Sequence, residues 1–255
     1  MCTVLTEGGT VALGPVTVLK FGSSLLADGA GFGVAVDEIA REVRAGRRVL
    51  AVVSAMRGTT DRLLDAAAAL TDRPADGLLS SLLQTGEDAS VALLTIALTA
   101  GGLNAHGVGA DALSLRTRGP LRDAEPVGVD LDRLTARLSA HQVVVVPGFV
   151  GRDSSGCPSL LGRGGSDLTA LFLAALIGAE EVRLVKDVDG VFAHDPRRGP
   201  PGAAALAHAT WGEVVRVGNG VVQEKALRFA EAQGLVFRVA APRGRGTLVG
   251  PGVAT

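Results

Sequence analysis

Cysteine and lysine are both scarce in this chain of 255 residues. The two cysteines, Cys2 and Cys157, lie far apart and match no metal-binding or redox spacing, so a disulfide scaffold is excluded and a reducing, cytoplasmic location is expected. Of the 25 lysine and arginine residues only three are lysines, Lys20, Lys186 and Lys225. A base-composition bias towards arginine is the simpler cause, but a lysine that persists in this background is a better candidate for a specific role.

The chain also lacks an excess of charge and a long apolar run. Its formal net charge is −1, so it has no general attraction to nucleic acid or to an anionic membrane, and any anion site must be local. No stretch of about 18 uncharged apolar residues is present. Residues 1–15 lack the basic start and apolar run of a signal peptide. We therefore expect no nucleic-acid partner, no membrane span and no secretory leader.

Apolar segments typical of strands alternate along the chain with apolar residues at helical spacing. Hydrophobic residues make up 47% of the sequence, which is enough to bury a sizeable core. The run of valines at 143–146 is typical of a strand covered on both faces. The alternation predicts an α/β fold with a mostly parallel sheet and helices on both faces. Strands are expected at 16–21, 49–53, 143–146, 182–185 and, as the last, 236–239, and helices over 36–43, 62–69, 78–98, 168–176 and 222–230.

Polar and glycine-rich clusters follow several of these strands, at the carboxyl ends where parallel sheets bind their ligands. The first cluster runs from Lys20 through Gly22 to Ser23 and Ser24. Glycine lets the backbone approach a phosphate closely, the following N–H groups can point at it, and Lys20 would add a point charge. A Walker motif is absent, and an ordinary turn at the end of a strand is the alternative.

Two further clusters place polar residues next to predicted helices. Ser54 and Thr60 belong to the segment SAMRGTTD after the second strand, where hydroxyls and a glycine before a helix could bind an anion. Alternatively, Thr60 or Asp61 is simply the N-cap of that helix. Glu87 follows Gly86 at the predicted head of an apolar helix, where it either complements the helix dipole or holds a substrate ammonium.

The segment LGRGGSD at 161–167 is the most informative part of the sequence. Its glycines permit tight approach and positive φ, and Ser166 is expected to cap the following helix. Arg163, which looks buried between the glycines, offers a planar fork that fits a carboxylate or a phosphate. The N–H groups at the helix start add an anion site, and Asp167 could order a lysine or a metal-bound phosphate. A flexible loop with an N-cap is the alternative, but function is favoured because a buried arginine there has little structural purpose.

The segment KDVDGVF, which begins at Lys186, follows another strand and is rich in turn-forming residues. Asp187 and Asp189 could contact a nucleotide or Mg²⁺, and Arg197 could contact a phosphate. A surface turn that carries polar side chains without a functional role is the alternative. The four histidines show no ligand spacing, and neither a GxSxG motif nor a catalytic Cys/His arrangement is present.

Taken in order, these clusters resemble the catalytic domain of aspartokinase, within the amino-acid kinase superfamily. That family has KFGGTS, a VSAMGGxTD-like segment, a Gly-Glu pair, a Pro-Gly-Phe segment, GRGGSD, DVDGxxxxDPR and a GAKVVHPRAL-like helix start. This chain has KFGSS, VVSAMRGTTD, Gly86-Glu87, PGF, an unchanged GRGGSD, an intact DVDGxxxxDPR and GNGVVQEKAL, between about Val16 and Val239. The resemblance implies a three-layer αβα sandwich, the amino-acid kinase fold, as a single domain over 1–255. Its substrate-binding lobe would span about 16–150 and its nucleotide-binding lobe about 151–245.

The resemblance also implies that the protein moves the γ-phosphoryl of ATP onto the side-chain carboxylate of L-aspartate. Lys20 and Asp167 would be the catalytic pair, and Mg²⁺ would bridge the phosphates. Arg163 would hold the α-carboxylate of the substrate and Glu87 its ammonium. The full substrate set would be Ser54, Thr60, Glu87, Arg163 and Ser166, and the nucleotide set Lys20, Gly22, Ser23, Lys186, Asp187, Asp189, Phe192, Arg197 and Lys225.

Three departures from the family pattern bear on the nucleotide. Ser23 replaces the second glycine of the phosphate loop, Phe192 stands where a tyrosine is common, and Gly220 stands where a nucleotide-contacting lysine is expected. We expect Lys186 to supply the lost charge, with Lys225 as the weaker candidate. The chain also ends about where the catalytic domain would end, so the tandem ACT domains that bind feedback amino acids are expected to be missing.

The sequence therefore predicts a cytoplasmic, homodimeric, ATP-dependent kinase that makes 4-phospho-L-aspartate. One alternative keeps the fold and changes the acceptor to glutamate or to an acid of specialised metabolism, since KFGSSLL also resembles the opening of glutamate 5-kinase. The other is a non-catalytic paralogue that binds a nucleotide or an amino acid. Gly220 and Phe192 favour that alternative, whereas the intact Lys20, Arg163 and Asp167 disfavour it.

Overall fold

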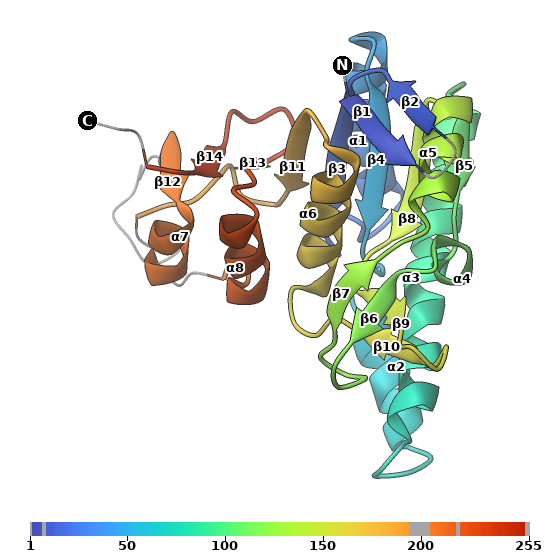
Figure 1. The fold of residues 1–255 in the computed structure, drawn as a ribbon. Helices are drawn as coiled ribbons and strands as arrows, with labels where there is room; N and C mark the ends of the chain where they lie inside the picture. The colour runs from blue at the N-terminus through green and yellow to red at the C-terminus, as the bar shows by residue number, and fades with distance from the viewer. Residues whose placement is uncertain (1, 7–8, 194–204, 218–219, 253–255) are drawn as a thin grey trace.

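A sheet of eight strands forms the centre of the computed structural model, which describes residues 2–6, 9–193, 205–217 and 220–252 (Figure 1). Neighbouring strands are parallel except for one antiparallel pair, β13 and β14. The mostly parallel sheet predicted from the sequence is therefore confirmed. Its strands, from one edge to the other, are β12 (His208–Thr210), β14 (Thr247–Gly250), β13 (Phe237–Ala240), β11 (Glu181–Val185), β3 (Val16–Phe21), β4 (Arg48–Val53), β8 (Val143–Pro147) and β5 (Ala105–Gly107).

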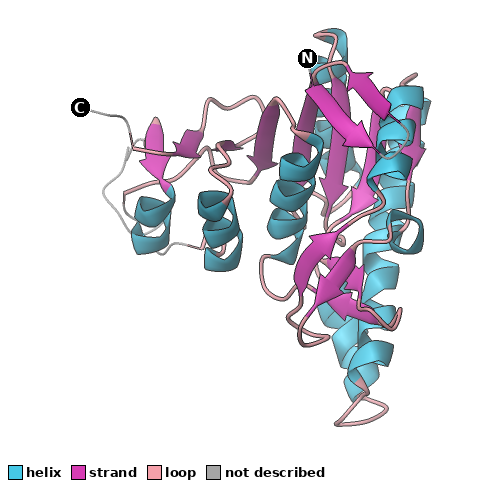
Figure 2. Cartoon of the chain, viewed as in Figure 1, coloured by secondary structure: helices cyan, strands magenta, loops and turns pink. Residues whose placement is uncertain are grey.

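Helices cover both faces of this sheet, which confirms the three-layer sandwich (Figure 2). Successive side chains of a strand point to opposite faces, so each strand serves two cores. Leu19 and Phe21 of β3 pack against one set of helices, and Val16 and Val18 pack against the other. The first set is α1 (Gly29–Arg44) and α3 (Asp76–Ala100); the second is α5 (Leu131–Ala140), α6 (Gly165–Ile177), α7 (Trp211–Val217) and α8 (Glu224–Ala232).

None of the described helices is long and apolar enough to cross a membrane.

A smaller sheet and two short helices lie beyond the carboxyl ends of β4 and β8 (Figure 1). A separate apolar cluster that includes Leu79, Leu83, Val150 and Leu160 joins them to α3. This arrangement builds a wall past the edge of the main sheet, where the polar clusters of the sequence lie. The elements are β10 (Pro158–Leu160), β9 (Val150–Arg152), β6 (Arg116–Arg118), β7 (Glu125–Gly128), α2 (Thr59–Ala68) and α4 (Ala110–Leu113). The hairpin of β1 (Cys2–Thr6) and β2 (Gly9–Leu13) forms a separate two-stranded sheet next to α5.

The run of valines in β8 behaves as its sequence predicts. All four side chains, Val143 to Val146, are fully buried, and they alternate between the two cores. Each such burial stabilises the fold by about 1.5–3 kcal/mol relative to an exposed side chain. The prediction that 236–239 is the last strand is wrong, because β14 follows it and pairs antiparallel with β13.

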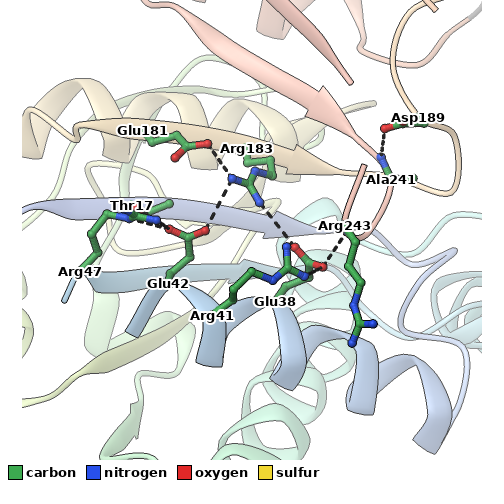
Figure 3. A network of polar contacts seen from close by, with 10 residues as sticks. All are labelled: Thr17, Glu38, Arg41, Glu42, Arg47, Glu181, Arg183, Asp189, Ala241 and Arg243. Carbon is green, nitrogen blue, oxygen red and sulfur yellow. Dashed lines mark hydrogen bonds and ion pairs between the residues drawn. The ribbon is translucent and has the colours of Figure 1, made fainter. Parts of the chain in front are cut away.

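A network of buried charges fastens α1 to the sheet (Figure 3). Glu38 and Glu42 of α1 are almost completely buried. Arg183 of β11 reaches Glu38 at 3.5 Å and Glu42 at 3.5 Å. It also forms a 2.7 Å ion pair with Glu181. Burial alone would lower the pKa of Arg183, but these three carboxylates raise it above its ordinary value. Arg183 is therefore the least exposed of the three arginines, with Arg41 and Arg47, that compensate the buried carboxylates of α1.

Removing this cation should destabilise the protein. In Arg183→Met, the only cations left beside Glu38 and Glu42 among the described residues are the more exposed Arg41 and Arg47, so we expect the free energy of unfolding to fall by about 2–4 kcal/mol. Arg228→Met is the control, because Arg228 pairs with Glu224 on an exposed helix face and such pairs contribute less than about 1 kcal/mol. Urea denaturation measures both. Equal losses in the two variants would show that the network is not a stabilising feature.

Candidate active site

The carboxyl ends of β3, β4 and β11 open into one cavity of about 530 Å³. The start of α6 and the segment before α8 complete its lining. The sequence clusters that follow separate strands thus meet at a single place, as expected for a parallel sheet. The lining residues are Lys20, Gly22, Ser23, Ser24, Ser54, Ala55, Thr60, Glu87, Phe149, Gly162, Arg163, Gly164, Gly165, Ser166, Asp167, Lys186, Asp187, Val188, Gly220, Val221 and Gln223.

Asp167 and the two lysines that pair with it, Lys20 and Lys186, form the charge centre of this cavity. Asp167 lies in the first turn of α6 and its carboxylate is buried. The Lys20 ammonium lies 2.8 Å from Oδ1, and the Lys186 ammonium donates to Oδ2 at 2.7 Å. Burial would raise the pKa of Asp167, but the two ammonium groups outweigh burial and hold it at about 2. The carboxylate is therefore ionised at neutral pH and is shared by two ammonium groups.

Glycines shape the loop that leads into α6. Gly162 and Gly164 have φ values of 74° and 76°, which residues with a Cβ adopt only at a cost. Gly164 is the N-cap of α6, so the expectation that Ser166 caps this helix is wrong, and Ser166 lies in the first turn. The expectation of a buried Arg163 is also wrong, because its side chain is exposed at the mouth of the cavity. An exposed arginine is free to reorient towards a ligand.

The loop after β3 brings the backbone close to the Lys20 ammonium. A Cβ on Gly22 would lie 3.3 Å from Lys20 Nζ, so a side chain there would press on the ammonium. The Gly22 carbonyl accepts hydrogen bonds from Leu25 and Leu26, which fixes the turn. Ser23 is exposed and lines the cavity next to this turn. These features fit the predicted phosphate loop.

Glu87 enters the cavity from the middle of a helix. The prediction that Glu87 stands at a helix start is wrong, because α3 begins about three helical turns before Glu87, at Asp76. Its side chain is buried, and Oε2 has no hydrogen-bond partner among the described residues. Burial raises the pKa of Glu87 to about 8, although a hydrogen bond from the Ala55 backbone and the charge of Lys20 act in the opposite direction. A buried acid with a free oxygen is ready to accept a hydrogen bond from a cation.

Ser54 and Thr60 line the cavity near Glu87. Ser54 directly follows β4, and Thr60 is the second residue of α2. Gly58, with φ at 72°, is the N-cap of α2, so neither Thr60 nor Asp61 caps that helix. The Thr60 hydroxyl is thus not committed to capping.

Of the residues predicted to contact a nucleotide, Lys20, Gly22, Ser23, Lys186 and Asp187 line the cavity, whereas Lys225 and Asp189 do not. The Lys225 ammonium binds the Asp123 carboxylate at 2.6 Å and the carbonyls of Asp123, Ala124 and Leu161, so it lies outside the cavity. Asp189 accepts a hydrogen bond from the Ala241 backbone at 3.1 Å and lies away from the cavity lining.

The other two predicted nucleotide contacts are not at the cavity lining either. Phe192 forms an isolated bridge with Ala205. Arg197 lies outside the described residues.

Sequence reasoning missed several lining residues. Ser24, Phe149, Val221 and Gln223 contribute to the cavity. Phe149 belongs to the Pro-Gly-Phe segment after β8, and its φ of 69° marks a sharp turn. Its place after a buried strand was a signal that could have identified it.

No group of three or more histidine, cysteine, aspartate or glutamate side chains suited to a metal ion occurs in the described parts of the chain. Both oxygens of Asp167 already face ammonium groups. Asp187 is therefore the cavity carboxylate best placed to approach a cation carried in by a ligand.

The buried acid predicts a specific pH dependence of stability. The folded protein holds a proton on Glu87 up to about pH 8, whereas the unfolded chain releases it near 4.5. The folded state therefore binds more protons between these values, so stability falls as the pH rises through this window and levels off above it. From pH 6 to pH 8 the parent should lose about 2 kcal/mol more than Glu87→Gln.

Urea denaturation at a series of pH values measures this difference, with Glu231→Gln as the exposed control. Parallel pH profiles for the parent and Glu87→Gln would contradict the raised pKa.

Comparison with known proteins gives the site its context. The profile of the amino acid kinase family matches residues 15–240. The aspartate kinase of Pseudomonas putida is 35% identical over 237 residues, covering 91% of this chain and 57% of the relative. The aspartokinase of Thermus thermophilus is 34% identical over 226 residues, covering 88% and 56%. The chain thus spans little more than half the length of these curated relatives.

Solved structures share the fold. The aspartate kinase from Synechocystis superposes with a TM-score of 0.80 at 31% identity, covering 94% of this chain and 41% of that one. Aspartokinase III of E. coli, in complex with aspartate and ADP, gives 0.82 at 24% identity, covering 94% and 65%. An isopentenyl phosphate kinase gives 0.67 at 18% identity, covering 91% and 99%. The last two likenesses show the fold alone, whereas the family profile spans most of the sequence, and the chain belongs to the amino acid kinase family.

Proposed function

We propose that the protein is an ATP-dependent kinase that phosphorylates the side-chain carboxylate of L-aspartate to give 4-phospho-L-aspartate. The observation that carries this proposal is the buried Asp167, which holds Lys20 and Lys186 side by side in a cavity with glycine-rich walls. Two ammonium groups at one point suit a polyphosphate. The similarity to relatives named aspartate kinase over most of this chain supports the acceptor.

The proposed acceptor site lies in the same cavity. Glu87 supplies a buried carboxyl group for the ammonium of an amino acid, and the exposed Arg163 supplies a fork for its α-carboxylate. Ser54, Thr60 and Ser166 offer hydroxyl groups in this cavity. A ligand with one ammonium and two carboxylates matches this set of charges.

The proposed reaction needs positioning and charge stabilisation more than acid–base chemistry. A carboxylate oxygen of aspartate attacks the γ-phosphorus of ATP, and the bond to the β–γ bridging oxygen breaks as ADP leaves with the electron pair. The attacking carboxylate is already ionised at neutral pH, so no residue has to remove a proton. Lys20 stabilises the charge on the transferring group, Asp167 orients Lys20, and the Gly22–Ser23 loop and the start of α6 offer backbone N–H groups.

Mg²⁺ fits this arrangement as a companion of the nucleotide. Mg²⁺ in kinases is held by one or two carboxylates together with substrate phosphates, and Asp187 at the cavity edge is the group that would hold it here. When bound, the ion offsets the negative charge of the phosphates. The proposed nucleotide contacts within the described residues are Lys20, Gly22, Ser23, Lys186 and Asp187. The predicted homodimer and cytoplasmic location remain expectations.

The fold alone does not select the acceptor, since an isopentenyl phosphate kinase shares it. A panel of acceptors therefore tests the proposal: L-aspartate, L-glutamate, other small acids and isopentenyl phosphate, each with Mg·ATP. Hydroxylamine trapping detects an acyl phosphate, and ADP release detects any transfer. We expect L-aspartate to give the highest kcat/KM. A higher value with another acceptor would replace the assignment, and no transfer to any acceptor would favour a non-catalytic binding protein.

Arg163 tests the acceptor site directly. Removing a charge-assisted contact costs about 1.5–3 kcal/mol, so Arg163→Ala should raise the KM for aspartate by about tenfold or more. Arg228→Ala serves as the control, because Arg228 is exposed on α8 and pairs with Glu224. An aspartate KM in Arg163→Ala equal to that of the parent would refute the role of Arg163.

A further inference from the structure

Two of the three lysines in the chain meet on one carboxylate, and both face the cavity. Lys20 comes from β3 and Lys186 directly follows β11, its neighbour in the sheet. Their ammonium groups lie 2.8 Å and 2.7 Å from the two oxygens of Asp167. The two ammonium groups therefore share one ion-paired carboxylate, and the Asp187 carboxylate, which also lines the cavity, acts on Lys186 through its charge.

The side chain of Lys186 is nearly buried, with 14% of its surface exposed. Burial lowers the pKa of Lys186, the nearby charge of Lys20 lowers it further, and Asp167 opposes both. Confining a second ammonium beside Lys20 is electrostatically unfavourable in the absence of an anion. Such an arrangement becomes favourable when an anion with several charges binds.

Among the described residues of the segment before α8, those that line the cavity, Gly220, Val221 and Gln223, carry no cation. Gly220 lines the cavity without a side chain, and a Cβ built there would meet only the Gln223 amide, at 3.7 Å. Gly220 is also the position where the resemblance to aspartokinase leads one to expect a lysine. The third lysine, Lys225, cannot replace it, because four oxygen contacts hold its ammonium outside the cavity.

The backbone around Lys186 is fixed before any ligand arrives. The Lys186 N–H donates to the Ala240 carbonyl at 2.9 Å. Asp189, three residues on, accepts from the Ala241 N–H at 3.1 Å (Figure 3). The β13–β14 connection is itself anchored, since its Arg243 N–H donates to the buried Glu38 of α1 at 2.8 Å. The backbone of Lys186 is thus anchored to the end of β13, and Asp189 of the same loop to the β13–β14 connection, which suits a preorganised electrostatic role.

We propose that Lys186 is a second catalytic cation, which contacts the phosphates of ATP together with Lys20 and takes the place of a cation missing at Gly220. This inference rests on the proposed kinase function. During transfer Lys186 stays protonated and forms no covalent bond. It stabilises the negative charge that passes from the transferring group to the leaving ADP.

Lys186→Gln is the main test, because glutamine keeps a donor for Asp167 and removes only the charge. Calorimetry should show the Kd for ATP rising by about tenfold to one hundredfold while the Kd for adenosine changes less than about twofold. Lys186→Arg should bind ATP within about threefold of the parent, since it keeps the charge. A merely structural role would weaken both ligands together. Lys225→Met is the comparison variant, and Arg133→Met on the distant α5 is the control.

A gain-of-function variant complements these losses. Gly220→Lys in the Lys186→Gln background should recover at least about a third of the lost ATP affinity, because a Cβ at this position meets only the Gln223 amide, at 3.7 Å. The φ of Gly220 is 69°, so this variant is expected to cost some stability, and its ATP affinity is compared with that of Gly220→Ala in the same background. The expected kcat of Lys186→Gln with aspartate is at least about tenfold below the parent value.

The proposal is wrong if Lys186→Gln binds ATP within twofold of the parent, or if it weakens ATP and adenosine equally. It is also wrong if Lys225→Met, and not Lys186→Gln, impairs ATP binding. Should Lys186→Gln fail to fold, the ratio of ATP to adenosine affinity in Lys186→Met decides by the same criterion. If the parent binds ATP but phosphorylates no acid, the proposed acceptor fails, whereas the comparison of ATP with adenosine still tests Lys186.

Discussion

The ion pairs of Asp167 with Lys20 and Lys186 are the interaction on which the cavity depends. Two ammonium groups confined this closely would repel each other, and the carboxylate between them makes their shared burial tolerable. Burying a carboxylate is itself costly, and the two cations compensate that cost. The three groups come from β3, α6 and the end of β11, so the charge centre joins elements that are far apart in sequence.

The sheet topology places this charge centre where the backbone can also contribute. Parallel strands end at the same edge, and the loops after β3, β4 and β11 all reach the cavity. Positive φ at Gly162 and Gly164 turns the chain sharply into α6, so that the first turn of this helix faces the same space. A positive pair of lysines and a helix start then act on any anion from two sides. The buried Glu87 of α3 adds to the same cavity a carboxyl group suited to a cation.

The sequence predicted the place of the site better than its geometry. The strands that carry buried runs, such as β3 and β8, were recognised because their burial on both faces leaves an unbroken apolar segment. The short strands of the small sheet were missed, since three or four residues show no clear alternation. The pattern of polar and apolar residues also does not show in which direction a side chain at a strand end or on a helix points. For this reason Lys225 and Asp189 were predicted to face the nucleotide, whereas tertiary contacts hold them elsewhere.

The N-caps of α6 and α2 were also predicted wrongly from residue type alone. Ser166 and Thr60 are good N-cap residues by type, but glycines in the left-handed region, Gly164 and Gly58, occupy the caps. The hydroxyl side chains are thereby left for the cavity. Local preference is overridden here at positions that line the candidate site, which is where such exceptions are expected in a folded protein.

A titration of the Asp167 side-chain carboxyl carbon by ¹³C NMR tests the central claim most directly, because it reads the charge centre without any assumption about the reaction. Asp167→Asn assigns the resonance by its disappearance. The account predicts a pKa of about 2, so the resonance should not move between pH 4 and pH 8. A titration midpoint at or above pH 4 would show that the two lysines do not hold this carboxylate in its charged form, and would contradict the account.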